Sequence, residues 1–366
     1  MAKPKIGLEL ELFLVNTDGS ISNDADVILK DERVKHFTVP ECTHSLIEIH
    51  TKPSTTINDL SADLYANLKT ISDVSKDNGL LLLPSTTIGR QIPKKRSNSR
   101  YETKEKILGK RKRELEYHIA GLHIHIDKHV DTKNQYALFH LLDPSFVSTS
   151  SSPFIRGVNT LHNHRANTYR NVVFEKNPIF GSLYEPGHVD PETYYAAAFE
   201  MWKTLCVEKG CSVEGFSSKN TYWGPIRFSE HTIESRGSDA TLPEIVLSQC
   251  ALYLGFQRRM SDISIKSFTK SEHAKLVAEG ISKGLESDLV HTYMHRLVQE
   301  AKKGLFQEEL SFLEPLENQL RTRRTFSNDI QDFAKKTGEY THGKISEKGA
   351  KAVRKYIAQT FFERLQ

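Results

Sequence analysis

Four short stretches of the chain alternate between apolar and polar residues, and this alternation predicts β-strands. They are residues 6–15, 45–51, 121–126 and 231–236. Because successive side chains of a strand point to opposite faces, each stretch has one apolar and one polar face. The apolar faces carry Leu and Ile, which need a core.

The rest of the pattern predicts how these strands combine with helices. Residues 4–130 are predicted to form short extended runs broken by turns, and residues 131–366 to be mostly helical. One further extended segment is expected near 220–236, within this helical part. Strands followed by helices, with a further strand inserted, favour an α+β fold with an antiparallel sheet over a doubly wound parallel one.

Two helices of the second half have recognisable starts. Thr241 and Glu244 have the spacing of a capping box before the apolar stretch 245–256. Ser346 is expected to begin a helix with one apolar face.

We predict a single domain over residues 1–366, with a sheet-rich core over about 1–240 and a helical part over about 241–366. Residues 270–366 are expected to form a helical layer on the apolar face of the sheet, because amphipathic helices need a partner. The solvated side of this layer is expected to include Lys351, Arg354 and Lys355.

The polar faces of the four strands carry pairs of functional residues. These pairs are Glu9 and Glu11, Glu48 and His50, His123 and His125, and Glu234 and Arg236. A face that is simply wetted by solvent, as is common in antiparallel sheets, is the alternative interpretation. Such a face would more naturally carry Lys, Thr, Ser and Gln.

Carboxylates and imidazoles that converge from separate strands form a site for hard divalent cations, and the excess of carboxylates favours magnesium or manganese over zinc. Arg236 would suit a phosphate oxygen beside the metal.

The composition is that of a folded protein. The chain has 366 residues, 38% of them hydrophobic and 26% charged, with a net charge of +4. These values exclude general disorder and a disulfide-stapled miniature fold, and they do not require a nucleic-acid partner. No apolar run is long enough for a membrane span, and Glu9 and Glu11 interrupt the stretch in which a signal peptide would be apolar. We therefore expect a cytoplasmic protein whose four cysteines are reduced thiols.

Residues 90–113 form a strongly basic segment, with eleven Lys or Arg against two Glu. Three interpretations stay open. The segment could be a solvated, mobile surface segment, a lid that attracts an anionic substrate such as a nucleotide, or a patch that binds nucleic acid. The last is the weakest, because Tyr101 is the only aromatic residue available for base stacking. The sequence has neither a G-x-x-x-x-G-K-[ST] nor a G-x-G-x-x-G motif, so metals and arginines would have to hold any nucleotide phosphates.

Five pieces of the sequence occur in an order that resembles a known family. They are GLELELF, SLIEIHTKP, GLHIHI, STSSSPFIRGVNTLHNHRANTYR and TYWGPIRFSEHTIESRGSD, and together they span roughly residues 5–240. This order resembles the type 2 glutamate–cysteine ligases, also called carboxylate–amine ligases, of the glutamine-synthetase-like superfamily. The resemblance implies an antiparallel sheet that forms a curved active-site funnel, with helices packed on its outer face.

The resemblance also implies a reaction and its residues. Such enzymes use ATP and Mg²⁺ to phosphorylate the side-chain carboxylate of glutamate, and an amine, typically that of cysteine, then forms a γ-glutamyl amide. The metal ligands it implies are Glu9, Glu11, Glu48, His123, His125 and Glu234. Arg236, Arg227 and Glu234 would act in catalysis, and Arg170, Arg227 and Arg236 would bind substrate or ATP. A glutathione-type metabolite would be the end product.

The chain departs from the family pattern at Leu10, where the middle position of E-x-E is usually acidic, and at Gly224-Pro225, where the family's W-D-x-R-P has an Asp. The amine acceptor, the acid substrate, the general base and the oligomeric state, including a homo-oligomer, therefore stay open. A protein of a different class, which binds an anionic polymer through residues 90–113 on a degenerate ligase fold, is the alternative. Its affinity for nucleic acid would fall steeply with salt and would need no metal.

Overall fold

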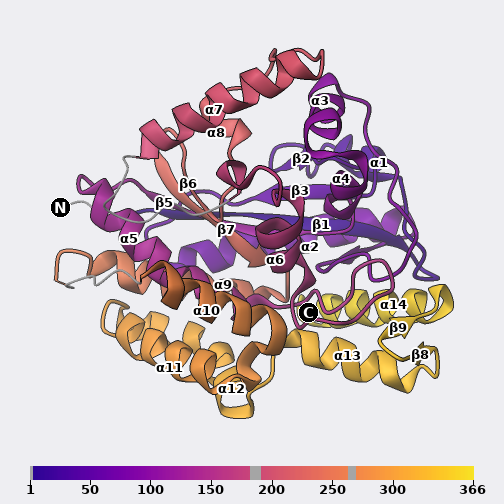
Figure 1. Cartoon of the computed structure of the whole chain (residues 1–366). Helices are drawn as coiled ribbons and strands as arrows, with labels where there is room; N and C mark the ends of the chain where they lie inside the picture. The colour runs from indigo at the N-terminus through magenta and orange to yellow at the C-terminus, as the bar shows by residue number, and fades with distance from the viewer. Residues whose placement is uncertain (1–2, 182–190, 263–268) are drawn as a thin grey trace.

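A seven-stranded antiparallel sheet lies at the centre of the computed structural model, which describes residues 3–181, 191–262 and 269–366 (Figure 1). The strand order is β2-β3-β1-β5-β7-β6, and β4 pairs with β1. Its strands are β1 (Ile6–Asn16), β2 (Thr38–Pro40), β3 (Leu46–His50), β4 (Leu80–Leu83), β5 (Gly121–Asp127), β6 (Ile226–Phe228) and β7 (Thr232–Asp239). The four predicted strands are therefore confirmed, as is the α+β class with an antiparallel sheet.

The alternation in β1 separates core from site. Leu8, Leu10 and Leu12 are at most 2% exposed on one face, while Glu9 and Glu11 lie on the other. The apolar face packs against α2 (Ile57–Asp77), α9 (Pro243–Arg258) and α14 (Glu347–Glu363). The burial of this face is the main force that fixes the register of the strands, because a shift by one residue would exchange the two faces.

The opposite face of the sheet is also covered. Helices α3 (Ser99–Leu108), α4 (Lys110–Glu116), α7 (Pro191–Glu208) and α8 (Ser218–Thr221) lie above the sheet in Figure 1, and the C-terminal helices lie below it. A cavity between the sheet and this upper layer holds the candidate site.

The remaining elements complete the two layers. The short ones are α1 (Ala25–Leu29), the 3₁₀ segments Asp143–Thr149, Pro178–Phe180, Gly284–Glu286 and Gln307–Leu313, the π-helical turn Thr168–Val173, and the hairpin β8 (Tyr340–Thr341) and β9 (Lys344–Ile345). The other helices are the four-residue α6 (His164–Asn167) and the longer α5 (Thr132–Leu142), α10 (Lys270–Lys283), α11 (Asp288–Lys302), α12 (Glu314–Thr322) and α13 (Phe326–Lys336). None of the described helices has both the length and the apolar character that a membrane crossing requires.

The prediction of only extended runs over residues 4–130 was wrong. Helix α2 has 21 residues, and Leu60, Leu64 and Leu68 recur at the four-residue spacing of one buried helix face. Its start is also marked, because the Thr56 side chain accepts a hydrogen bond from the backbone N–H of Asp59. Two shorter helices, α3 and α4, occupy most of the basic segment.

Two expectations about the C-terminal helices also need correction. Helix α9 starts at Pro243 without a side-chain cap, so Thr241 does not form the predicted capping box. Arg354 is fully buried instead of solvated. Its guanidinium donates to the backbone oxygens of Gly19 and Thr87 and pairs with Glu347 at 2.6 Å, and these contacts satisfy the buried charge. Ser346 does cap α14, as predicted.

Candidate active site

The register of the sheet brings the polar pairs of the four strands together. Glu9 lies between two imidazoles, opposite His50 on β3 and opposite His123 on β5. Glu11 lies opposite Glu48. On the neighbouring strands β5 and β7, His125 lies opposite Glu234. Residues from distant parts of the sequence thus form one continuous polar surface.

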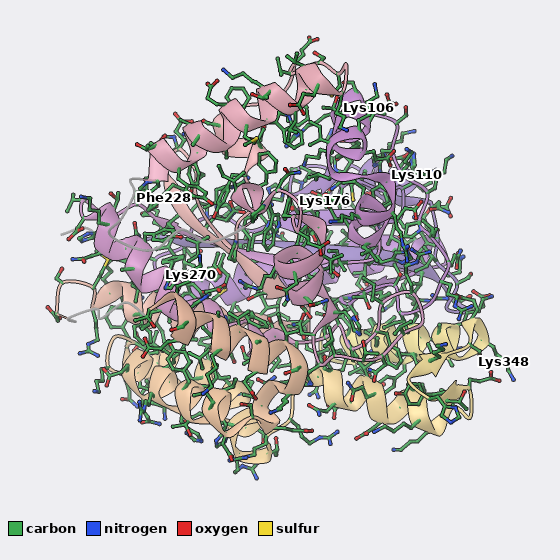
Figure 2. All side chains as sticks on the ribbon, viewed as in Figure 1. Lys106, Lys110, Lys176, Phe228, Lys270 and Lys348 are labelled. Carbon is green, nitrogen blue, oxygen red and sulfur yellow. The ribbon has the colours of Figure 1, made fainter. Side chains whose placement is uncertain are left out.

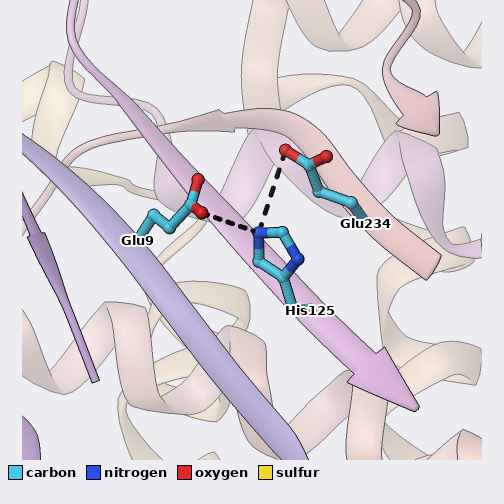
Figure 3. Close-up of side chains that lie close together, drawn as sticks. All are labelled: Glu9, His125 and Glu234. Atoms are coloured by element: carbon cyan, nitrogen blue, oxygen red, sulfur yellow. Dashed lines mark ion pairs between the residues drawn. The ribbon is translucent and has the colours of Figure 1, made fainter. Parts of the chain in front are cut away.

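Short contacts connect these side chains. His123 Nδ1 lies 2.9 Å from a Glu9 oxygen, and His125 Nε2 lies 3.3 Å from the other oxygen of Glu9. Figure 3 shows His125 between Glu9 and Glu234, whose nearest oxygen is 3.9 Å from Nε2. Each histidine therefore faces at least one carboxylate across the face of the sheet.

Two arginines are positioned by Glu234, which is fully buried at the centre of the site. Arg227 Nη2 lies 2.6 Å from Glu234 Oε2, and Arg236 Nε lies 3.0 Å from Glu234 Oε1. Although burial alone would raise it, the two guanidiniums hold the pKa of Glu234 at about 2. The carboxylate is therefore ionised and keeps both arginines in fixed positions.

Three groups of carboxylate and imidazole atoms are close enough to share an ion, with all ligand atoms of each group within 4.8 Å of one another. Glu9 belongs to two of the groups and Glu48 to two. The groups are Glu9 with His125 and Glu234, Glu9 with Glu48 and His50, and Glu11 with Glu41 and Glu48. The third consists only of carboxylates, which is the ligand set that magnesium and manganese prefer.

The electrostatics of the carboxylates fit a bound cation. Burial, together with the charges of Glu9 and Glu41, raises the pKa of Glu48 to about 9. Burial and Glu41 also raise the pKa of Glu11 well above its usual range. Three acidic groups this close cannot all be ionised unless positive charge is added, and a divalent ion would supply that charge.

The orientation of His125 fits the same role. Its Nδ1 is hydrogen-bonded to Thr232 Oγ1 at 3.1 Å, which fixes the ring. Its Nε2 is buried between Glu9 and Glu234, 3.3 and 3.9 Å away, and makes no well-directed hydrogen bond to a described residue. A metal-ligating histidine has this arrangement, with one nitrogen held by a neighbour and the other directed at the ion.

A cavity of about 290 Å³ lies over the acidic groups. Its floor contains Glu9, Glu11 and Glu48, and its roof contains Arg100, Lys104 and Arg113 of α3 and α4. The basic segment therefore faces the site, as the lid interpretation predicts, and does not form a purely solvated excursion. Burial and the neighbouring guanidiniums of Arg113 and Arg100 lower the pKa of Lys104 well below its usual range.

An aromatic wall closes another side of this cavity. The rings of Tyr169 and Trp223 stack with centroids 4.2 Å apart, and both line the cavity. The departure at Gly224 has a steric cause, because a Cβ at this position would lie 2.1 Å from the ring of Tyr222. Tyr222 lines the cavity as well, so the glycine makes room for this ring.

Six of the residues predicted from the sequence line this cavity, namely Glu9, Glu11, Glu48, His123, Arg227 and Arg236. His125 lies beside them and lines an adjoining hollow that shares Glu9 with the cavity. Glu234 lies beneath, in contact with both arginines.

Arg170 is not brought to the cavity. Its guanidinium makes two hydrogen bonds, of 2.8 and 2.9 Å, with the buried Asp143, and it packs against the ring of Phe146. The expected contact of Arg170 with substrate is therefore absent from the described cavity lining, and its geometry is that of a structural ion pair.

Glu41 is the metal-type residue that the sequence did not reveal. It follows β2, and it joins Glu11 and Glu48 to form the all-carboxylate group. No alternating pattern surrounds it, because β2 has only three residues. The proximity of an acidic residue to the end of a predicted strand is the only signal that could have suggested it.

Comparison with known proteins identifies the family of this sheet and site. The model of the family described as glutamate–cysteine ligase family 2 matches residues 5–201, more than half of the chain. The chain belongs to this family. The matched part contains Glu9, Glu11, Glu48, His123 and His125 but ends before Glu234.

Curated relatives of the family are distant and longer than the aligned part. A protein from Paraburkholderia xenovorans named "Putative glutamate--cysteine ligase 2" is 29% identical over 174 residues, which are 44% of this chain and 46% of that protein. One of the same name from Roseiflexus castenholzii is 24% identical over 50% of this chain and 46% of its own length. The chain thus aligns with about half the length of these relatives.

Two solved structures share the fold over almost the whole chain. The glutamate–cysteine ligase of Francisella tularensis, crystallised with AMP, superposes with a TM-score of 0.61 at 16% identity, over 99% of this chain and 89% of that one. A bifunctional glutathione synthetase from Pasteurella multocida gives a TM-score of 0.64 at 14% identity, over 98% of this chain and 53% of that one.

Proposed function

We propose that the protein is an ATP- and Mg²⁺-dependent carboxylate–amine ligase, with glutamate and cysteine as the first substrate pair to test. The observation that carries this proposal is that three potential metal groups and two fixed arginines lie around the cavity and the hollow that adjoins it at Glu9. Membership of the family and the AMP-bound ligase of similar fold support the same reaction class.

The reaction that this site would catalyse has two steps. The γ-phosphoryl group of ATP moves to the side-chain carboxylate of the acid, which releases ADP and leaves an acyl phosphate. The amine nitrogen then attacks the acyl carbon, an amide bond forms, and inorganic phosphate leaves while the amine loses a proton. Both steps gather several anions in one place, so they need positive charge that is already in position.

One set of residues would hold the metal ions, and two arginines would contact the phosphoryl group. Glu9, Glu48, His125 and Glu234, together with Glu11, Glu41, His50 and His123, would hold Mg²⁺. When bound, Mg²⁺ would supply the positive charge that the phosphate groups need. Arg236 and Arg227, held by Glu234, would donate hydrogen bonds to the transferring phosphoryl group.

The two hollows that share Glu9 suggest where the substrates bind. The hollow that contains His50, His125 and Thr232 adjoins the metal groups from one side, and the cavity beneath α3 and α4 adjoins them from the other. A nucleotide in the first and an acid in the second would place phosphate and carboxylate on opposite sides of Glu9. The cations of the cavity roof would attract the acid.

The test is a screen in which ATP and MgCl₂ are combined with each of the common amino acids and with small amines. ADP release is followed together with the mass of any amide product. The proposal predicts ADP release that requires both an acid and an amine, and a product whose mass equals their sum minus water. ATP turnover that does not depend on any acid or amine, or no turnover with any pair, would contradict it.

A further inference from the structure

Helix α4 separates the cavity described above from a second, larger hollow. Arg113 and Glu116 of this helix line the cavity, while Arg111, Lys112 and Leu115 line an open groove on its other side. The groove has a volume of about 890 Å³, which lies within the range of small-molecule sites. No part of the ligase reaction proposed above uses it.

Five cationic side chains surround this groove, and none of the described residues that line it is acidic. They come from four separate segments of the chain and are Arg90, Arg111, Lys112, Arg156 and Lys344. The rest of the lining is apolar and includes Leu115 and Val158. The groove therefore combines an apolar surface with a ring of positive charge.

Most of this charge is not neutralised by the protein. Lys112 pairs with Glu175 at 3.2 Å, and Arg156 is 3.9 Å from Glu114. Arg90, Arg111 and Lys344 make no ion pair within the described ranges, and all three are exposed. Cations that converge on a concave surface repel one another, and a bound anion would remove this repulsion.

The backbone at Arg156 is built for this position. Arg156 has a φ of +51°, a left-handed conformation that is unfavourable for a residue with a side chain. Two backbone hydrogen bonds of the next residue anchor this turn, from Gly157 N–H to Ile88 O at 2.8 Å and from Ile345 N–H to Gly157 O at 2.9 Å. The turn therefore lies against the loop before Arg90 and against β9, which carries Lys344.

We propose that this groove is a second binding site, for a small anion that has an apolar body and at least two negative charges, such as an organic phosphate. The apolar lining would contact the body of the ligand, and the uncompensated guanidinium and ammonium groups would bind its phosphate or carboxylate oxygens. None of the described residues that line the groove is aromatic, which argues against the base stacking that a single-stranded nucleic acid would use.

Binding of octyl phosphate to the full chain, measured by calorimetry at low salt, tests this site. Inorganic phosphate, which lacks the apolar body, and octyl glucoside, which lacks the charge, are the two control ligands. We expect saturable binding of octyl phosphate at one site, and binding at least about tenfold weaker for both controls.

Three variants locate the binding. The exposed pair Arg111→Glu and Lys344→Glu should together weaken octyl phosphate about tenfold or more. Lys270→Glu is the matched control, because Lys270 is exposed on α10, far from Lys110 and α4 in Figure 2. Glu234→Gln should leave this binding unchanged, so the result does not depend on the proposed ligase reaction.

The outcomes that would overturn the proposal are equally defined. Octyl phosphate that binds the double variant as tightly as the native protein would exclude the groove. Equal weakening by Lys270→Glu would indicate diffuse attraction to a basic surface. A single-stranded oligonucleotide that binds more tightly than octyl phosphate, and loses affinity in the double variant, would assign the groove to a polymer instead.

Discussion

Glu11 and Glu48 lie directly opposite each other on neighbouring strands, so two carboxylates face each other in the interior of the sheet. Like charges in this position destabilise a sheet unless something neutralises them. In the absence of metal, a proton would be the neutralising partner. Burial, together with the charges of Glu9 and Glu41, raises the pKa of Glu48 to about 9, and burial, Glu41 and Glu48 raise the pKa of Glu11 well above its usual range.

This pair predicts how stability depends on pH and metal. An acid whose folded pKa is raised takes up a proton on folding, so the metal-free protein should lose stability as pH rises from about 4.5 towards 9. Glu48→Gln should remove the contribution of Glu48 to this loss and stabilise the metal-free protein at pH 7 by about 2–3 kcal/mol. Denaturant unfolding in EDTA measures both effects. A variant less stable than the native protein in EDTA at pH 7 would contradict the account.

The roof of the cavity predicts a second effect. Lys104 lines the cavity beside Arg100 and Arg113, and it makes no ion pair with an acidic side chain in the described part of the chain. Lys104→Gln should raise the KM of the acid substrate about 10- to 100-fold with a smaller change in kcat, because a bound anion would favour the ammonium form of Lys104 and the variant loses this contact. Steady-state kinetics at saturating ATP measures this. A fall in kcat with an unchanged KM would contradict a role in binding.

Gly224 predicts a steric effect that a matched control isolates. A Cβ at Gly224 would collide with Tyr222, whereas a Cβ at Gly210 would meet no heavy atom of the described residues within 4 Å apart from its own chain neighbours. Both glycines have a positive φ. Gly210→Ala should therefore show only the backbone penalty of about 1 kcal/mol. Gly224→Ala should cost an additional 1–3 kcal/mol or so, since the ring has to move. Equal losses in chemical denaturation would show that the ring adapts without cost.

Buried histidines predict a loss of stability in acid. Burial lowers the pKa of His118, His162 and His164 to about 4. Between about pH 6.5 and 4 these histidines bind protons in the unfolded chain but stay neutral in the folded protein. The free energy of unfolding therefore falls as pH falls. His162→Gln should reduce the slope of unfolding free energy against pH by up to about 1.4 kcal/mol per unit in this window. An unchanged slope would exclude a contribution from His162.

The local pattern of the chain predicted the strands and their polar faces because both depend on a two-residue period. The alternation in β1 is sufficient to place Glu9 and Glu11 on the face opposite Leu8 and Leu10. The four-residue spacing of Leu60, Leu64 and Leu68 indicates the helix α2 in the same way. The turn-forming residues around it conceal this spacing.

Other features depend on contacts that no local pattern contains. Glu41 joins the site only because β2 pairs with β3, and the position of α3 and α4 over the sheet is set by tertiary packing. Arg354 occupies a polar position of an amphipathic helix, yet its partners come from residues far away along the chain. Arg170 is the opposite case. Its sequence position suggests a contact with substrate, but its guanidinium forms an ion pair with Asp143 instead.

The central claim, that the polar faces of four strands form one metal site, is tested most directly by counting bound Mn²⁺. Equilibrium dialysis or electron paramagnetic resonance at pH 7 gives this number without any substrate. We predict at least two ions per chain in the native protein and fewer, or markedly weaker, binding in Glu9→Gln, because Glu9 belongs to two of the three groups. The exposed His342→Gln variant serves as the control and should bind as the native protein does. Native protein that binds no Mn²⁺ at millimolar concentration, or binding unaffected by Glu9→Gln, would contradict the account.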